Sequence, residues 1–330
     1  MRITKPSYFD SFGCLASACP DSCCKEWDVQ VDAKTADLYR SLPGALGDRL
    51  RQVMYTEEGE VYLAIEDRRC PMWQEDGLCR IQTELGHDAL CKTCREFPRL
   101  THDYGDFMEM GLELSCPEAA RLILSAGNEP PVTEKVPGGE PPEYDADAMA
   151  VLLRSREIAL AILWDEAYAP NEALVQLLYY GYQAQGELDG EPAEEFTPAD
   201  LGAMDFPAGD ISGLLAFFQT LEILTPQWQT RLSSPAQPGP WQESFRNLAR
   251  YFVERYWLQA VSDYDLVCRV KLAVVSCLAI HLLGGNLAET AQVYSKEIEN
   301  SANNVDALLD AAYTCPVFTD QNLLGLLLNP

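Results

Sequence analysis

Residues 265–283, DLVCRVKLAVVSCLAIHLL, are apolar on nearly every side of the helix that they would form. A surface helix carries an apolar stripe on one face only, whereas a helix that is apolar all round is buried. Gly284 and Gly285 follow directly, and glycine is the residue that most often ends a helix. The pattern therefore predicts the central helix of a helical bundle.

Amphipathic segments on both sides of this stretch predict the rest of an all-α domain. In each of them apolar residues recur at helical spacing. The segments are 149–163, 172–182, 212–224, 241–261, 287–300, 305–313 and 320–328. We expect an acidic α-helical domain over residues 148–330.

The first part of the chain has a different pattern. Alternating apolar residues predict short strands at 27–31, 61–65 and 107–114, and helical spacing predicts short helices at 33–42 and 116–124. Residues 128–147 are rich in Pro, Gly and acids, which is typical of a linker. The predicted fold class is mixed: a small cysteine-rich α+β metal-binding domain (1–127), a linker (128–147) and the all-α domain.

Composition excludes several classes of protein. A hydrophobic share of 47% over 330 residues rules out a largely disordered chain. The net charge is −27, and residues 128–330 carry 10 Lys and Arg against 29 Asp and Glu. Contacts to phosphates need clustered cations, so we expect no nucleic-acid partner and no anionic membrane partner.

The chain shows no export or membrane signal. No apolar run approaches the roughly 18 residues of a membrane span, and Asp10 interrupts the place where a signal peptide would have its apolar core. We therefore expect a cytoplasmic protein, in which thiols stay reduced.

Nine of the twelve cysteines lie in the first 116 residues, where they form two clusters. Cys91 and Cys94 have the Cys-x2-Cys spacing that lets a tight turn aim two thiolates at one ion. The clusters predict at least one metal site, with iron–sulfur and zinc both open. The candidate ligands are Cys14, Cys19, Cys23, Cys24, Cys70, Cys79, Cys91, Cys94 and Cys116. The isolated Cys268, Cys277 and Cys315 are predicted to be core residues.

Familiar catalytic motifs are missing from the sequence. Cys19 and Cys23 match the first interval of the radical S-adenosylmethionine signature, but Glu26 stands where the third cysteine belongs. Neither a glycine-rich nucleotide loop nor a G-x-S-x-G elbow is present. His87 and His102 lie near thiols and are possible ligands, whereas His281 falls on the apolar helix and is predicted to be a core residue.

Tyr294, Glu297 and Ser301 share one face of the helix predicted at 287–300 and its end. Tyr294 and Glu297 are candidate catalytic residues, because such a face can recognise a lysine ammonium or assist its deprotonation. The alternative is a solvated helix end with ordinary side-chain pairs.

Three segments carry a family resemblance over most of the chain: YFDSFGC…CPDSCCKEWDVQVD from Tyr8, DRRCPMWQEDGLCRIQTELGHDALCKTCREFPR from Asp67, and YSKEIENSANN from Tyr294. They resemble the flagellin lysine-N-methylase family, and the second is also similar to cysteine-rich domains that chelate zinc or iron. The resemblance implies a protein-lysine N-methyltransferase that acts on flagellin. It also implies S-adenosylmethionine as methyl donor. It further implies an iron–sulfur cluster of the 4Fe-4S type on the nine N-terminal cysteines, with zinc as the alternative.

Methylation of a lysine sets one chemical requirement, and two functions other than this enzyme remain open. A lysine amine with a pKa of about 10.4 must lose its proton before it can attack a methyl group, and a base or an apolar site has to bring this about. The alternatives to an enzyme are a zinc- or iron-binding adaptor and an iron–sulfur redox protein.

Overall fold

Helix α12 (Val267–Leu283) is the centre of the molecule, of which a computed structural model describes residues 1–191 and 206–329. All 17 of its residues are buried, as the sequence predicts. At its end Gly284 has a φ of +62°, and a Cβ there would lie 2.8 Å from the carbonyl oxygens of Ala236 and Gln237. The helix therefore ends where the chain needs a residue without a side chain.

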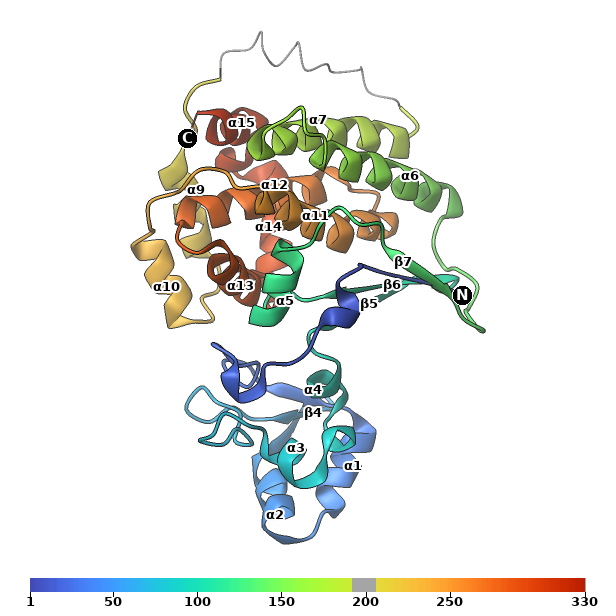
Figure 1. The fold of residues 1–330 in the computed structure, drawn as a ribbon, viewed down its shortest axis with the longest axis vertical. Helices are drawn as coiled ribbons and strands as arrows, with labels where there is room; N and C mark the ends of the chain where they lie inside the picture. The colour runs from blue at the N-terminus through green and yellow to red at the C-terminus, as the bar shows by residue number, and fades with distance from the viewer. Residues whose placement is uncertain (192–205, 330) are drawn as a thin grey trace.

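The helices around α12 form layers above and below it in Figure 1. Each helix predicted after residue 148 is present in the described part of the chain, and α10 was not predicted. They are α6 (Ala146–Leu163), α7 (Pro170–Leu188), α9 (Ile211–Thr220), α10 (Pro226–Ser233), α11 (Ser244–Tyr256) followed by η4 (Trp257–Ser262), α13 (Leu287–Ile298), α14 (Ala302–Thr314), η5 (Pro316–Phe318) and α15 (Asp320–Leu328). None of the described helices is long and apolar enough to span a bilayer.

Two cations on α12 are buried, and each pairs with a carboxylate that is partly exposed. Arg269 pairs with Asp263 at 2.8 Å. The Lys271 ammonium donates to the carbonyl oxygens of Ala312 and Phe318 at 3.1 Å and pairs with Asp320 at 3.0 Å. Because a buried charge is tolerated only when it is paired and hydrogen-bonded, these contacts fix where the C-terminal helices pack on α12.

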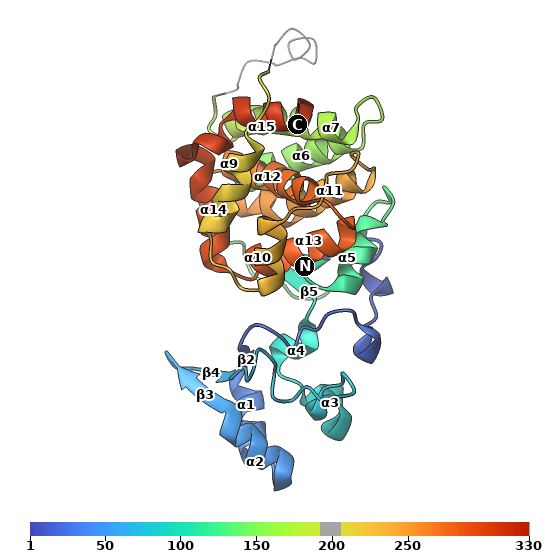
Figure 2. The ribbon, with the colours of Figure 1, turned by 90° about the vertical axis from the view of Figure 1, so that its left-hand side faces the viewer.

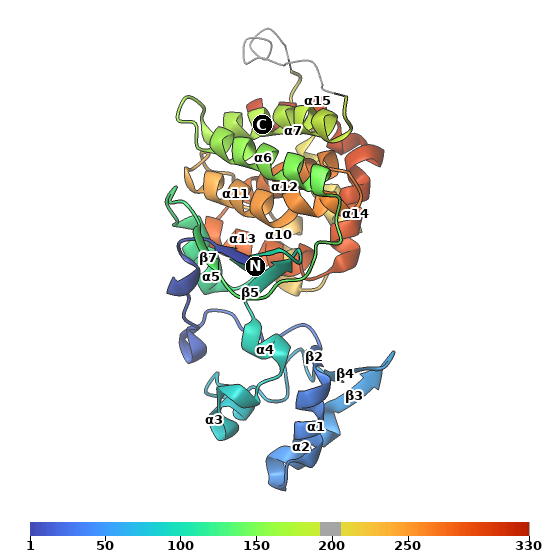
Figure 3. The ribbon, with the colours of Figure 1, turned by 90° about the vertical axis from the view of Figure 1, so that its right-hand side faces the viewer.

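A four-stranded sheet lies against the lower side of the helices in Figure 1 and Figure 3. Its order is β5-β6-β1-β7, with β1 parallel to β6 and the other pairs antiparallel. The strands are β1 (Arg2–Lys5), β5 (Arg99–Asp103), β6 (Phe107–Leu112) and β7 (Val132–Lys135). Short helices η1 (Phe9–Ser11) and α5 (Pro117–Leu124) follow β1 and β6 and pack on the same core. Strand β6 was predicted, but the other three strands of this sheet were not.

The remaining N-terminal residues form a smaller lobe with a core of its own. Figure 2 shows it projecting below the helical part. It contains a three-stranded antiparallel sheet of order β2-β4-β3. Its elements are η2 (Ala16–Ala18), β2 (Val29–Val31), α1 (Ala33–Ser41), α2 (Gly44–Val53), β3 (Met54–Glu57), β4 (Glu60–Leu63), α3 (Arg80–Leu85), η3 (His87–Ala89) and α4 (Lys92–Glu96).

The structure groups the chain differently from the predicted division at 1–127, 128–147 and 148–330. Phe9, Phe107, Leu112 and helix α5 belong to the helical core, and β7 of the sheet lies inside the predicted linker. We call residues 13–96 the cysteine-rich lobe, and residues 1–12 with 97–329, where described, the helical lobe. The physical reason is that strand β1 pairs with segments more than a hundred residues away, which local composition does not reveal.

Candidate functional site

The twelve cysteines are all free thiols, and the nine predicted ligands gather around the cysteine-rich lobe. Cys70 and Cys24 are joined through their backbones, with the Cys70 N–H donating to the Cys24 carbonyl at 2.8 Å. The Cys24 thiolate accepts hydrogen bonds from the thiols of Cys23 and Cys70, which lowers the pKa of Cys24 to about 3. The same bonds raise the pKa of both donors.

Cys91 and Cys94 form a second pair on the first turn of α4. The Cys94 thiol donates to Cys91, which lowers the pKa of Cys91 and raises that of Cys94. Burial raises the pKa of Cys79, and the charges of Cys24 and Cys91 raise it further. The thiols that influence one another in this way form what we call the inner thiol cluster. Its members are Cys23, Cys24, Cys70, Cys79, Cys91 and Cys94.

Three further thiols lie where the two lobes meet. Burial raises the pKa of Cys116 to about 11, and the charges of Cys19 and Cys14 contribute to the rise. Cys116 precedes α5 in the helical lobe, whereas Cys14 and Cys19 belong to the other lobe. Electrostatic influence thus links thiols of both lobes, although they are spread over a hundred positions of the sequence.

The thiols are arranged in pairs and not as a preformed ligand shell. Among residues 1–191 and 206–329, no group of three or more His, Cys, Asp or Glu side chains is placed to hold a metal ion. The donor set nevertheless suits a soft metal, because two of the thiols are already biased toward the thiolate that a metal requires. Metal binding at these cysteines stays a prediction.

Asp21, within the CPDSCC segment, fastens the cysteine-rich lobe to helix α13. Its carboxylate accepts from the Lys296 ammonium at 2.9 Å and from the Gln292 amide at 3.2 Å. The Lys296 ammonium also lies 5.2 Å from the centre of the Trp27 ring. Two of the three segments that carry the family resemblance are thus in direct contact.

The predicted face of Tyr294, Glu297 and Ser301 is buried, so the alternative of a solvated helix end does not apply. The Tyr294 hydroxyl shares a hydrogen bond of 2.8 Å with Ser276 on α12. The Glu297 carboxylate accepts from the Leu224 N–H at 2.7 Å. Ser301 accepts from the N–H of Asn304 and begins α14. A role in lysine recognition remains untested, and none of the three side chains lines a cavity described below.

The three histidines lie in different surroundings. His87 is exposed beside Asp88. His281 stacks on Trp241 with 3.9 Å between ring centres, and burial lowers its pKa to about 4, so its prediction as a core residue is confirmed. Cys268 and Cys277 are buried as predicted, and Cys315 is half-buried. His102 lies on β5 and faces a cavity.

This cavity, which we call the sheet pocket, has a volume of about 620 Å³ and lies between the four-stranded sheet and helices α6 and α11. Its floor is a row of polar side chains that crosses all four strands. Strand register places His102 opposite Glu109, Glu109 beside Thr4, and Thr4 opposite Thr133. Because side chains at matched positions point to the same face of a sheet, the row is directed into the pocket.

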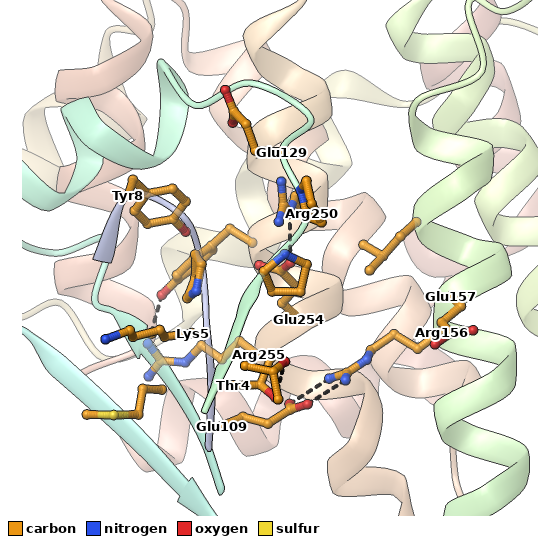
Figure 4. A pocket seen from close by; sticks show the side chains of 18 of the residues that line it. Thr4, Lys5, Tyr8, Glu109, Glu129, Arg156, Glu157, Arg250, Glu254 and Arg255 are labelled. Carbon is orange, nitrogen blue, oxygen red and sulfur yellow. Dashed lines mark hydrogen bonds and ion pairs between the residues drawn. The ribbon is translucent and has the colours of Figure 1, made fainter. Parts of the chain in front are cut away.

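Arginine–glutamate pairs surround the pocket (Figure 4). Arg156 of α6 reaches Glu109 with two hydrogen bonds of 2.7 and 2.5 Å. On α11, Arg250 pairs with Glu254 at 2.7 Å. Arg255 of the same helix pairs with the buried Glu299 of the YSKEIEN segment at 3.1 Å. Such a set of fixed charges in a water-poor cavity can orient a ligand that carries both charges.

Two polar atoms in the pocket wall have no partner. His102 Nε2 and Trp164 Nε1 are buried, and nothing in the described part of the chain accepts from or donates to them. Burial lowers the pKa of His102, and the charges of Arg255 and Arg156 lower it further against the opposing effect of Glu109. Buried polar groups are normally satisfied, so these two atoms mark the place where a ligand is expected.

The sequence analysis did not identify the sheet pocket. His102 was considered only as a metal ligand, and the described structure places it opposite Glu109 in the lining of the sheet pocket. Glu109, Arg156 and Arg255 had no motif to identify them. Knowledge of the strand register would have revealed the polar row, but that register depends on the long-range pairing of β1.

The chain is similar to curated proteins of Salmonella. It is 35% identical over 132 residues to the flagellar biosynthetic protein FliU of Salmonella muenchen, a match that covers 38% of this chain and 78% of FliU. It is 34% identical over 142 residues to the lysine-N-methylases of Salmonella typhimurium and Salmonella choleraesuis, covering 41% of this chain and 35% of each relative. The match thus spans about a third of those two proteins. No protein-family model and no solved structure matches.

Proposed function

The chain belongs to the lysine-N-methylase family, a family of methyltransferases, and from this premise we propose that it methylates lysine ε-amino groups of a protein with S-adenosylmethionine as donor. We place the reaction in the sheet pocket, which is the observation that supports the proposal. Its volume of about 620 Å³ falls in the range of cofactor sites, and its wall holds unsatisfied polar atoms.

The groups of the pocket match the chemistry of the donor. S-adenosylmethionine carries a carboxylate, an ammonium, a sulfonium and an adenine ring, and when bound it supplies the methyl group. Arg250 and Arg255 would face its carboxylate, and Glu254 its ammonium. Trp164 Nε1 needs an acceptor, which the donor's carboxylate or adenine nitrogens provide. The pocket therefore fits this ligand by charge and by its missing hydrogen bonds.

Flagellin is the protein substrate that we propose, with the reaction in the cytoplasm. The support is the flagellar name of one relative and the acidity of the chain. A net charge of −27 attracts segments that carry exposed lysines, which raises their encounter rate at low salt.

We further propose that the inner thiol cluster, with the junction thiols Cys14, Cys19 and Cys116 as reserve ligands, holds a metal. An iron–sulfur cluster of the 4Fe-4S type is favoured and zinc is the alternative. Cys24 and Cys91 are the natural first ligands, because their hydrogen bonds already favour the thiolate. When bound, the metal supplies bonds that hold short elements together in a lobe with a small core.

Incubation of the anaerobically purified chain with flagellin and methyl-labelled S-adenosylmethionine tests the function. We expect label on lysine side chains, located by peptide mass spectrometry. A matched pair of variants tests the pocket: Glu109→Gln removes one charge from the floor, whereas Glu187→Gln removes one from an exposed pair with Arg154 far along α7.

We expect Glu109→Gln to lower the rate at least tenfold and Glu187→Gln to leave it unchanged. Absence of label on any lysine with the metal content intact would contradict the methylase, and would favour the metal-binding adaptor. Equal rates in the two variants would remove the sheet pocket from the reaction.

A further inference from the structure

We propose that His102 is the catalytic base of the reaction: its Nε2 accepts the proton of the substrate lysine ε-ammonium in the sheet pocket. The inference rests on the proposed function and adds to it the residue that prepares the nucleophile. It is carried by the position of His102 on the pocket floor and by the lack of a partner for Nε2 in the described residues.

The sheet holds His102 in a fixed place. It sits on β5 opposite Glu109, which is locked in turn by two hydrogen bonds from Arg156. A base on a strand is positioned more precisely than one on a loop. His102 is half-buried and lines the pocket, so a ligand in the pocket can reach it.

The other titratable groups of the pocket are already engaged. Glu109 and Glu254 are held by arginines, and the Tyr251 hydroxyl lies between Arg255 and Glu299. Burial raises the pKa of Tyr8, which therefore keeps its proton near neutral pH. Glu129 and Glu157 are exposed. Among the described lining residues, His102 thus has the buried ring nitrogen that is free to take a proton.

The charges that face His102 come from every element packed around it, and they favour the neutral, proton-accepting form. Burial lowers the pKa of His102 most, and cations from α6 and α11 lower it further. The carboxylate opposite His102 on β6 raises this pKa. These groups are Arg156, Arg255 and Glu109, with Lys5 of β1 on the pocket wall already paired to Asp10 and Glu134. The same cations lower the pKa of a substrate lysine ammonium bound beside them, which makes it easier to deprotonate.

In the proposed step, each bond that breaks is matched by one that forms. The N–H bond of the lysine ammonium breaks, and its proton passes to His102 Nε2. The freed lone pair forms an N–C bond with the methyl group of the sulfonium donor, and the C–S bond breaks with its electron pair leaving on sulfur. His102 returns its proton to solvent when the products leave. Proton transfer by a positioned side chain contributes roughly 10²- to 10⁴-fold to a rate.

A pH profile separates this role from a structural one. kcat/KM for flagellin methylation is measured from pH 5 to pH 10 for the wild-type chain, for His102→Gln and for Thr101→Val. Thr101 is the exposed neighbour on β5 and reports on damage to the strand alone. Thermal melting and binding of S-adenosylmethionine, by calorimetry, verify that each variant is folded and loads its donor.

We expect wild-type activity to fall as the pH drops through the lowered pKa of His102. At pH 7.5, His102→Gln should be about 10²- to 10⁴-fold slower, and the deficit should shrink as the pH approaches about 10, where free lysine deprotonates by itself. Thr101→Val should follow the wild type.

The role of His102 is overturned if the wild-type chain is active and His102→Gln has the same pH profile of kcat/KM. It is also overturned if the variant loses the same fraction of kcat/KM at every pH. Either result leaves the proposed methylase activity standing. A wild-type chain that methylates at no pH overturns the proposed function itself and this inference with it.

Discussion

The two lobes reach a folded state by different means. The helical lobe is built on α12, whose 17 residues are all buried, and nearly all of its large apolar side chains join one core. The cysteine-rich lobe joins fourteen buried residues, two of them cysteines, in a separate core under short strands and helices. The first lobe has enough apolar area to be stable alone, whereas a lobe with so small a core usually needs a cross-link or a metal. The comparison implies that removing thiols and removing core leucines will damage different halves of the molecule.

The largest effect is expected from Cys91→Ala or Cys94→Ala. Either change breaks the thiolate pair that we propose as metal ligands, so metal content and the stability of the cysteine-rich lobe should fall together. Metal analysis and calorimetry, in which this lobe should lose its own melting transition, provide the measurement. Cys277→Ala in the helical core is the control, with unchanged metal. Full metal in both variants would contradict the ligand assignment.

The converse change is Leu278→Ala on α12. Leu278 is completely buried, so truncation leaves a cavity and should cost roughly 2–5 kcal/mol of unfolding free energy. Denaturant titration followed by tryptophan fluorescence measures it. Metal content should not change, because the helix takes no part in the thiol clusters. Loss of metal in this variant would show that the lobes do not fold independently.

The pH dependence of stability also distinguishes the helical lobe from the cysteine-rich lobe. Burial lowers the pKa of His281 to about 4 in the folded state, against about 6.5 when unfolded. The stability of the helical lobe should therefore be full above pH 6.5 and decline as the pH falls toward 4, by roughly 2–3 kcal/mol. His281→Phe should flatten this decline in unfolding curves recorded between pH 7 and pH 4.5, whereas the exposed His87→Phe should not.

The smallest effect is expected where the lobes meet. Lys296→Met keeps the aliphatic stem but removes the ammonium that binds Asp21 and lies against Trp27. Asp21 retains Gln292 and Lys25 as partners, so the cost should be about 1–2 kcal/mol. Limited proteolysis should then cut the cysteine-rich lobe from the helical lobe sooner than in the wild type, with each lobe still folded. Unchanged cleavage would mean that other contacts, such as Arg68 to the Leu224 carbonyl, hold the lobes together.

The sequence predicted those parts of the fold that depend on local pattern. The all-apolar helix, its glycine stop and the amphipathic helices around it follow from spacing alone, and each is found in the described structure. The short strands β2, β4 and β6 were expected for the same reason. Strands β1, β5 and β7 were missed because they carry few apolar residues and gain their stability from distant partners.

The site was predictable only in part. Nine cysteines crowded into one region predicted a metal site. In the described residues Cys24 and Cys91 are hydrogen-bonded to neighbouring thiols, but no group of three is placed to hold an ion, so the ligand set stays a prediction. The polar row of His102, Glu109, Thr4 and Thr133 has no sequence signature, because four strands from three parts of the chain contribute to it. Tyr294 and Glu297 share a helix face as expected, but which neighbours cover that face depends on the packing of α12 and on residues near Leu224.

The position of β1 in the middle of the sheet has a consequence for biosynthesis. Residues 2–5 leave the ribosome well before their partners on β6 and β7, which are synthesised more than a hundred residues later. The cysteine-rich lobe, which lies between them in the chain, is complete before the sheet can close. During translation the thiols are therefore available to the metal that we propose while the sheet pocket still lacks part of its floor. Metal delivery and assembly of the reaction site would thus be ordered in time by the path of the chain.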